Sequence, residues 1–123
     1  SHKRKAFNFD LDNGKLEELY PSPSGSTTSY NNAWSKIKAF MEANGFEHSQ
    51  YSGYESIHGM SYADAFSVFG ELQETFPWFR ECAQAATLTE IGKRHDVLEH
   101  LDHINDEMEF QMSLKLMYPF NLR

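Results

Sequence analysis

The residues with the clearest chemical potential are two carboxylates, Asp10 and Asp12, in the alternating segment 5–12. Apolar residues fill the intervening positions, and successive side chains of a strand point to opposite faces of a sheet. The segment therefore predicts a strand with one apolar face and one face that carries carboxylates. Hard oxygen ligands suit Mg²⁺, so Asp10 and Asp12 could bind a divalent metal or act as acid and base. Alternatively, Asp12 is a structural cap of the turn that Asn13–Gly14 indicates.

Other candidate groups are more scattered. Five of them lie close together within residues 95–103: His95, Asp96, Glu99, His100 and His103. Asp96, His100 and His103 would share one face of a helix, so they could bind a transition metal, although polar helix surfaces show the same pattern without one. His48 and His58 are isolated, and His48 could take part in proton transfer. Cys82 is the single cysteine, which excludes an intramolecular disulfide and favours a small buried residue in a cytoplasmic protein.

Composition limits the function classes. The chain has 123 residues, of which 40% are hydrophobic, and this predicts one folded domain. No apolar run approaches the roughly 20 residues that span a bilayer, so we expect no membrane partner. The formal net charge is −7, which argues against broad, passive binding of nucleic acid but not against an enzyme that contacts RNA at a local basic area.

Hydrophobic periodicity predicts the elements that must position these groups. After the first strand we expect a helix over 30–44, strands over 46–54 and 54–58, a helix over 61–76 that Ser61 caps and Pro77 ends, a strand over 83–91, and helical structure from 96 onward. The core is expected to contain the aromatic residues Trp34, Phe66, Phe69 and Trp78. The order β-α-β-β-α-β predicts an α+β fold, a ferredoxin-like sandwich over 3–92 with a C-terminal helical extension over 93–123. The small residues Ala85 and Ala86 would let another backbone or subunit approach closely.

A sheet of this kind has one face without helices, and Asn8, Asp10 and Asp12 would point to it. An open sheet face must be covered or hydrated, and pairing of two copies is a common solution. Two-fold pairing over this face would bring the two copies of Asp10 close together. The sequence thus predicts a homodimer with its carboxylates near the interface.

Several ordered motifs resemble the virulence-associated protein D (VapD) family over roughly residues 5–91. They are Ala6–Asp12, Tyr20-Pro21, Tyr30–Ala33, Asn44–Glu47, Ser49-Gln50 with Ser52 and Tyr54, and Phe76–Phe79. The resemblance implies a ferredoxin-like homodimer that is related in structure to the CRISPR adaptation nucleases. It also implies endoribonuclease activity, in some members as the toxin of a toxin–antitoxin pair. The family's first-strand aspartate matches Asp10, and its strand-two serine and tyrosine match Ser52 and Tyr54.

The chain also departs from that family. Family members carry a charged Arg-Asp type of step after the Trp-Phe pair, whereas this chain has Cys82–Ala86 there. The segment beyond Lys93 exceeds the usual family core and could reshape the dimer, bind an antitoxin or regulate access. Loss of that charge could alter the chemistry or the contact between the two copies.

The sequence therefore predicts a small dimeric endoribonuclease. Asp10 would position Mg²⁺ or help to activate the attacking oxygen, and Ser52 and Tyr54 would hydrogen-bond phosphate or order the site. Its partners would be RNA, a second copy and an antitoxin protein. Two alternatives stay open: a non-catalytic interaction module that uses the acidic surface and helical extension, and a metal or small-ligand sensor that uses the histidines.

Overall fold

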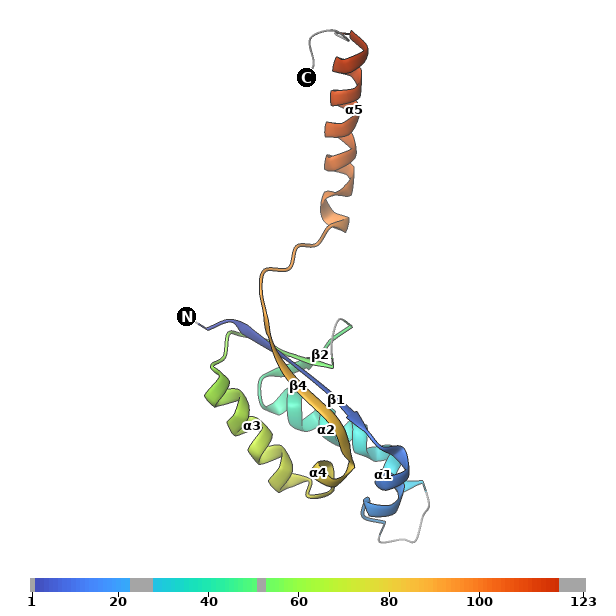
Figure 1. Ribbon diagram of the computed structural model, residues 1–123, viewed down its shortest axis with the longest axis vertical. Helices are drawn as coiled ribbons and strands as arrows, with labels where there is room; N and C mark the ends of the chain where they lie inside the picture. Colours follow the sequence, from blue (N-terminus) through green and yellow to red (C-terminus); the bar gives the residue numbers. More distant parts are fainter. Residues whose placement is uncertain (1, 23–27, 51–52, 118–123) are drawn as a thin grey trace. The chain divides into compact units, whose positions relative to one another are not determined.

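The computed structural model describes residues 2–22, 28–50 and 53–117 (Figure 1). The chain divides into two compact units, residues 1–92 and 93–123. The first unit contains the sheet and the helices that pack on it, and the second contains the last helix.

A four-stranded antiparallel sheet forms the centre of the first unit. Its strands are β1 (Arg4–Leu11), β2 (Phe46–His48), β3 (Tyr54–Ser56) and β4 (Ala83–Ile91), and they lie in the order β2-β3-β1-β4. Each neighbouring pair is antiparallel. The predicted α+β class is confirmed. The first strand of the sequence lies inside the sheet, while β2 and β4 are its edges.

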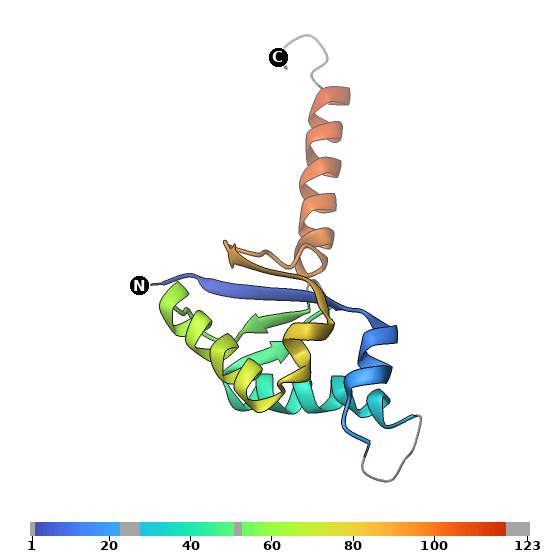
Figure 2. The same ribbon diagram turned by 60° about the horizontal axis from the view of Figure 1, so that its bottom comes forward.

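Helices follow β1 and β3. They are α1 (Asn13–Leu19), the 3-10 helix η1 (Ser29–Asn32), α2 (Ala33–Ala43), α3 (Tyr62–Thr75) and α4 (Trp78–Cys82). Figure 2 shows α2, α3 and α4 on the same side of the sheet. The core lies between these helices and the sheet, and its fully buried members include Leu16, Ile37, Met41, Phe46 and Leu72. None of the helices described in this unit lies on the opposite face of the sheet.

Local structure differs from the sequence prediction around residues 13–14. The strand ends at Leu11, and Asp12 then caps helix α1, since its Oδ1 accepts a hydrogen bond from the Lys15 amide at 3.1 Å. Asn13 and Gly14 thus begin a helix rather than a turn. An N-cap carboxylate satisfies an amide that the first helical turn leaves unpaired, which explains why the chain can change from strand to helix within two residues.

Two aromatic residues that the periodicity assigns to the core are instead exposed. Phe66 on α3 has 62% of its surface accessible, and Trp34 on α2 has 41%. Trp78 is buried as expected. The apolar stripe of a helix indicates which face is apolar, but not whether the unit supplies a surface to cover all of it.

The second unit contains the 3-10 helix η2 (Leu98–His100) and helix α5 (Leu101–Met117). Many of its large apolar side chains are exposed: Val97, Leu98, Leu101, Met108, Phe110, Met112, Leu116 and Met117. Within the described ranges, none of the helices has both the length and the apolar character that a membrane span requires.

Candidate active site on the open sheet face

Strand register places Asp10 on the face of the sheet that lacks helices. Asp10 pairs with Ala85 and Asn8 pairs with Thr87 on β4. Phe7 and Phe9, which alternate with them, contact the aromatic side chains of the core. Because strand side chains alternate between faces, Asn8 and Asp10 point away from that core. Asp10 is exposed, and Ala85 opposite it adds little bulk, so the carboxylate is accessible to a ligand.

A hydrogen bond fixes the connection between β2 and β3 next to this position. The amide of Gly53 donates to Oδ1 of Asn8 at 2.6 Å. A Cβ atom at position 53 would lie only 2.8 Å from the carbonyl oxygen of Phe7, so the close approach requires glycine. The neighbouring Ser52, a predicted site residue, lies outside the described residues.

Tyr54, the other predicted site residue, lies on the opposite face. It pairs with Phe7, and its ring centroid is 6.2 Å from that of Phe9 and 5.2 Å from that of His48. Tyr54 is only 5% exposed. Burial raises the pKa of its hydroxyl above the usual value, and the negative charge of Glu42 raises it further. The structure therefore does not bring Tyr54 together with Asp10 of the same chain.

Asp12 occupies a structural position beyond the end of β1. One carboxylate oxygen caps α1, and the other accepts a hydrogen bond from Nε2 of Gln84 at 3.3 Å. The register of β1 and β4 shifts between Asp10 and Leu11, which aligns Gln84 with the cap. Asp12 thus holds α1 and the start of β4 together.

Three or more candidate metal ligands do not come together within the described part of the chain. No group of three or more His, Cys, Asp or Glu side chains there could hold a metal ion. Asp96 accepts a hydrogen bond from the amide of Leu98 at 3.0 Å, which is the local role of a helix-start residue. The side chains of Glu99 and His103 lie outside the described residues.

An ionic cluster that the sequence did not reveal holds β1, β2 and β3 together at the end of β1 away from Asp10. Nε of Arg4 donates to the carbonyl oxygen of Ser56 at 2.7 Å. The same guanidinium lies 3.5 Å from Glu55 and 3.7 Å from Glu47. Glu55 is 3% exposed, so Arg4 offsets a charge that is largely withdrawn from water. Only the register, which depends on long-range pairing, could have identified these partners.

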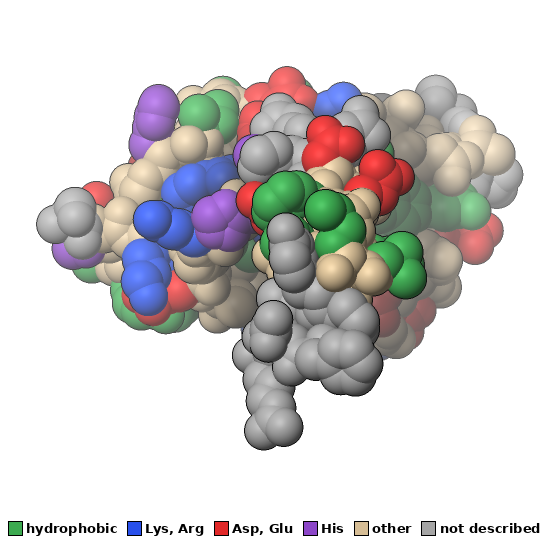
Figure 3. All heavy atoms as spheres, turned by 90° about the horizontal axis from the view of Figure 1, so that it is seen from above, with side chains coloured by type: hydrophobic (Ala, Val, Ile, Leu, Met, Phe, Trp, Pro, Cys, Tyr) green, Lys and Arg blue, Asp and Glu red, His purple; other side chains and the backbone are tan. Residues whose placement is uncertain are grey.

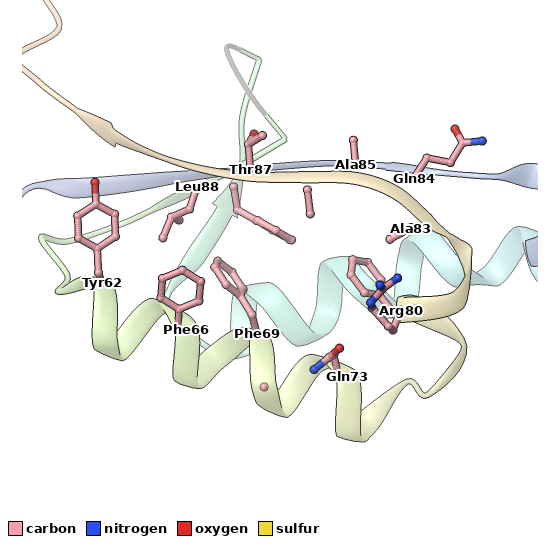
Figure 4. Close-up of a pocket in the computed structure, with 14 residues that line it drawn as sticks. Tyr62, Phe66, Phe69, Gln73, Arg80, Ala83, Gln84, Ala85, Thr87 and Leu88 are labelled. Atoms are coloured by element: carbon pink, nitrogen blue, oxygen red, sulfur yellow. The ribbon is translucent and has the colours of Figure 1, made fainter.

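A second feature is an apolar groove on the helix side, between β4 and α3 (Figure 4). Its volume is about 690 Å³, and Tyr62, Phe66 and Phe69 of α3 point toward the strand. Phe66 was predicted to be a core residue, so the groove was not anticipated. Arg80 lies at the end of the groove near Ala83.

Charge is unevenly distributed over the surface. In the view of Figure 3, several Lys and Arg side chains gather beside histidines, while Asp and Glu side chains lie in other areas. The chain carries 11 Lys and Arg residues and 18 Asp and Glu residues, which gives a net charge of −7. The area with several Lys and Arg side chains therefore differs in sign from the chain as a whole.

Neither family models nor curated proteins gave a match to this chain. The resemblance to the VapD family therefore stays a prediction that depends on the ordered motifs.

Proposed function

We propose that this chain is a cytoplasmic endoribonuclease of the VapD type that works as a homodimer and has an antitoxin partner. The observation that carries the proposal is the exposed carboxylate of Asp10 on the helix-free face of a central strand. A folded domain gains no packing from a carboxylate there. The motifs around Asp10, described above, are the second support.

The strand order supports the proposed ferredoxin-like arrangement. In the order β2-β3-β1-β4, helices connect β1 to β2 and β3 to β4, and β2 and β3 are antiparallel neighbours. Each helical connection carries more than one helix, because α1 precedes α2 and α4 follows α3. These additions lengthen the crossovers and leave the order of the strands unchanged.

Asp10 could serve RNA cleavage in either of two ways. As a base, its carboxylate would accept the proton of the oxygen that attacks the phosphorus atom. With Mg²⁺ bound, Asp10 would be the protein ligand, because this ion is commonly held by one or two carboxylates together with waters and substrate phosphates. The metal would supply charge to stabilise the transition state. A single accessible carboxylate fits both roles.

Neighbouring side chains would bind the RNA. Asn8 uses its Oδ1 to accept from Gly53, which leaves its amide group as the donor for a phosphate or sugar oxygen. Thr87 pairs with Asn8 and adds a hydroxyl on the same face. A flat, open face suits single-stranded RNA, whose bases and backbone are accessible. Of the two roles considered for Tyr54, ordering the site fits its buried position better than contact with phosphate.

Cleavage assays with Asp10→Asn test the proposal. We expect the variant to cut single-stranded RNA at least about 100-fold more slowly than the wild type, because one proton-transfer or charge-stabilising group typically contributes that much. Glu71→Gln is the matched control, since Glu71 is exposed on α3. Assays with and without Mg²⁺ separate the two roles of Asp10. Equal cleavage by wild type and Asp10→Asn would refute the catalytic assignment.

A non-catalytic interaction module is the second candidate. The exposed apolar side chains of α5 favour it, because such a helix is stabilised by a protein surface that covers it. If purified protein cuts no RNA but binds a protein partner through α5, the nuclease proposal gives way to this one. Under the nuclease proposal, the same helix is the candidate surface for the antitoxin.

A further inference from the structure

The outer edge of β4 is an unprotected strand edge. β4 pairs with β1 along one side, and no described strand pairs with its other side. The pairing is regular from Ala85 to Ile91, so no bulge interrupts the strand there. Soluble proteins usually protect such an edge with lysine, proline or a charged side chain, and the segment 83–89 contains none of these. Because an edge strand directs every second amide and carbonyl group outward, β4 can bind an extended chain through its backbone.

The groove beneath β4 lies where alternate side chains of such an extended chain would point. The helix side of the groove is one face of α3, positions 62, 66, 69, 70 and 73. Phe66 is 62% exposed and Tyr62 is 47% exposed, and both rings point toward β4 (Figure 4). A Cβ atom at Gly70 would meet nothing within 4 Å, which leaves space beside the rings. The groove therefore favours an occupant with apolar side chains at every second position.

The two ends of the groove differ in charge. Arg80, at the end near Ala83, is the only charged residue among the described residues that line the groove (Figure 4). Its side chain is exposed, and Gln73 adds an amide group at the same end. Toward the other end of β4, the charge of Lys5 is already matched by Glu90, which lies 3.6 Å from its Nζ. A single cation in an apolar groove of a chain with net charge −7 favours an occupant with one carboxylate at that end.

Strand direction determines which end of the occupant meets Arg80. All neighbouring strands of the sheet are antiparallel, and a strand added antiparallel to β4 runs from Glu90 toward Ala83. Its C-terminal end therefore lies beside Arg80. The register with β1 shifts between Asp10 and Leu11, and α4 joins β4 at this same end, so regular pairing stops there. A chain that ends at this point places its terminal carboxylate next to the guanidinium.

We propose that the edge of β4 and the groove beneath it bind the C-terminal segment of another protein. The segment binds as an added antiparallel strand, with apolar side chains at every second position and its terminal carboxylate on Arg80. The site uses neither Asp10 nor α5, so the inference goes beyond the proposed nuclease and its antitoxin. The homodimer predicted from the sequence pairs over the open sheet face and leaves this edge free.

Binding of a synthetic peptide to the full chain tests the site. The probe is acetyl-Thr-Val-Thr-Val-Thr-Leu with a free C-terminal carboxylate, and the same peptide with a C-terminal amide is its control. By calorimetry we expect the acid to bind with a Kd of about 0.1 mM or lower, and the amide to bind at least about tenfold more weakly, because it lacks the charge-assisted hydrogen bond to Arg80.

Substitution of the cation assigns that difference to Arg80. Arg80→Gln should remove the difference in affinity between the acid and the amide. Lys36→Gln, which removes an exposed lysine on α2 outside the groove, should preserve it. The proposal is wrong if the wild type binds no peptide at about 1 mM, or if it binds the acid and the amide equally.

N-methylation of the probe tests pairing through the backbone. Two versions each carry methyl groups on alternate amides, so the methyl groups of one version face β4 and those of the other face away. Only the version whose methyl groups face β4 should lose binding, by about tenfold or more, because its hydrogen bonds to the edge are removed. Equal losses in the two versions, or no loss in either, would contradict strand pairing.

Two further measurements separate this site from other surfaces and other occupants. Phe66→Ala should weaken binding of the acid at least about tenfold, whereas Trp34→Ala, at an exposed aromatic on α2 outside the groove, should not. Sedimentation velocity with and without peptide should give the same oligomeric state. Conversion of a dimer to monomers by the peptide would assign the edge to a second copy and overturn the proposal. No RNA is used and the free protein is not required to be a dimer, so failure of the proposed function is distinguishable from failure of this inference.

Discussion

Asp10 and Tyr54 lie on opposite faces of the same sheet, although both matched the site residues of one family. Asp10 faces the helix-free side, while Tyr54 is 5% exposed in the core and pairs with Phe7. One phosphate could not contact both side chains of a single chain. Any catalytic role of Tyr54 is therefore indirect, through the packing that holds β3 against β1.

Substitution of Tyr54 distinguishes ordering from contact. Tyr54→Phe keeps the ring and should leave RNA cleavage within about threefold of wild type, whereas loss of a phosphate contact would cost about tenfold or more. Tyr54→Ala should lower the free energy of unfolding by about 3–5 kcal/mol, as for other buried aromatic residues. Urea denaturation and cleavage rates measure the two effects. A large loss of cleavage in a stable Tyr54→Phe variant would restore the direct role.

Gly53→Ala should disrupt the connection beside the site. Its Cβ would meet the carbonyl oxygen of Phe7 at 2.8 Å, and backbone cannot move aside as a flexible side chain can. We expect a loss of about 1–3 kcal/mol in unfolding free energy. Gly70→Ala is the control, since nothing lies within 4 Å of a Cβ in the middle of α3, and alanine there should stabilise the helix by about 0.5–1 kcal/mol. Equal effects of the two substitutions would contradict the close approach.

Asp12 should matter for stability and not for cleavage. Asp12→Ala removes the cap of α1 and the acceptor for Gln84, so we expect about 1 kcal/mol of destabilisation. Asp12→Asn keeps a capping oxygen and should be close to wild type in stability. Thermal unfolding and RNA cleavage of both variants check this. Loss of cleavage in the stable Asn variant would instead assign Asp12 to metal binding.

The free energy of unfolding should fall at alkaline pH because the Cys82 thiol ionises. Burial raises the pKa of the Cys82 thiol, and the nearby charge of Asp12 raises it further. The folded state then holds the proton more tightly than the unfolded state. The thiol therefore has no effect below its unfolded pKa of about 8.5 and destabilises the fold as pH rises above that value.

Urea midpoints measured from pH 7 to 10 in wild type and Cys82→Ala check this effect. Loss of the side chain will itself shift the urea midpoint of the variant, so the slopes of the midpoint against pH are compared. The midpoint of the wild type should decline more steeply with pH than that of the variant. A thiol reagent provides a second measurement, because Cys82 is fully buried and should react only after unfolding. Rapid labelling of folded protein, or equal slopes, would contradict the assignment.

Residue pattern alone predicted the elements in which local signals agree. The alternation in 5–12 predicted β1 and its two faces, and the strand predicted over 83–91 is β4. Ser61 caps α3 through the amide of Asp64, and that helix ends just before Pro77, as expected. In these segments side-chain periodicity, cap and helix breaker indicate the same structure, so no distant contact is needed to decide it.

Tertiary structure decided which residues share a face and which remain uncovered. Arg4 meets Glu55 only because β1 and β3 pair in one register, and the same register separates Tyr54 from Asp10. Phe66 carries the same apolar signal as a core residue, yet the described part of the first unit leaves it 62% exposed. The residue pattern specifies which side chains each surface carries. Strand pairing over long sequence separations determines where that surface lies and which side chains remain uncovered and accessible to a partner.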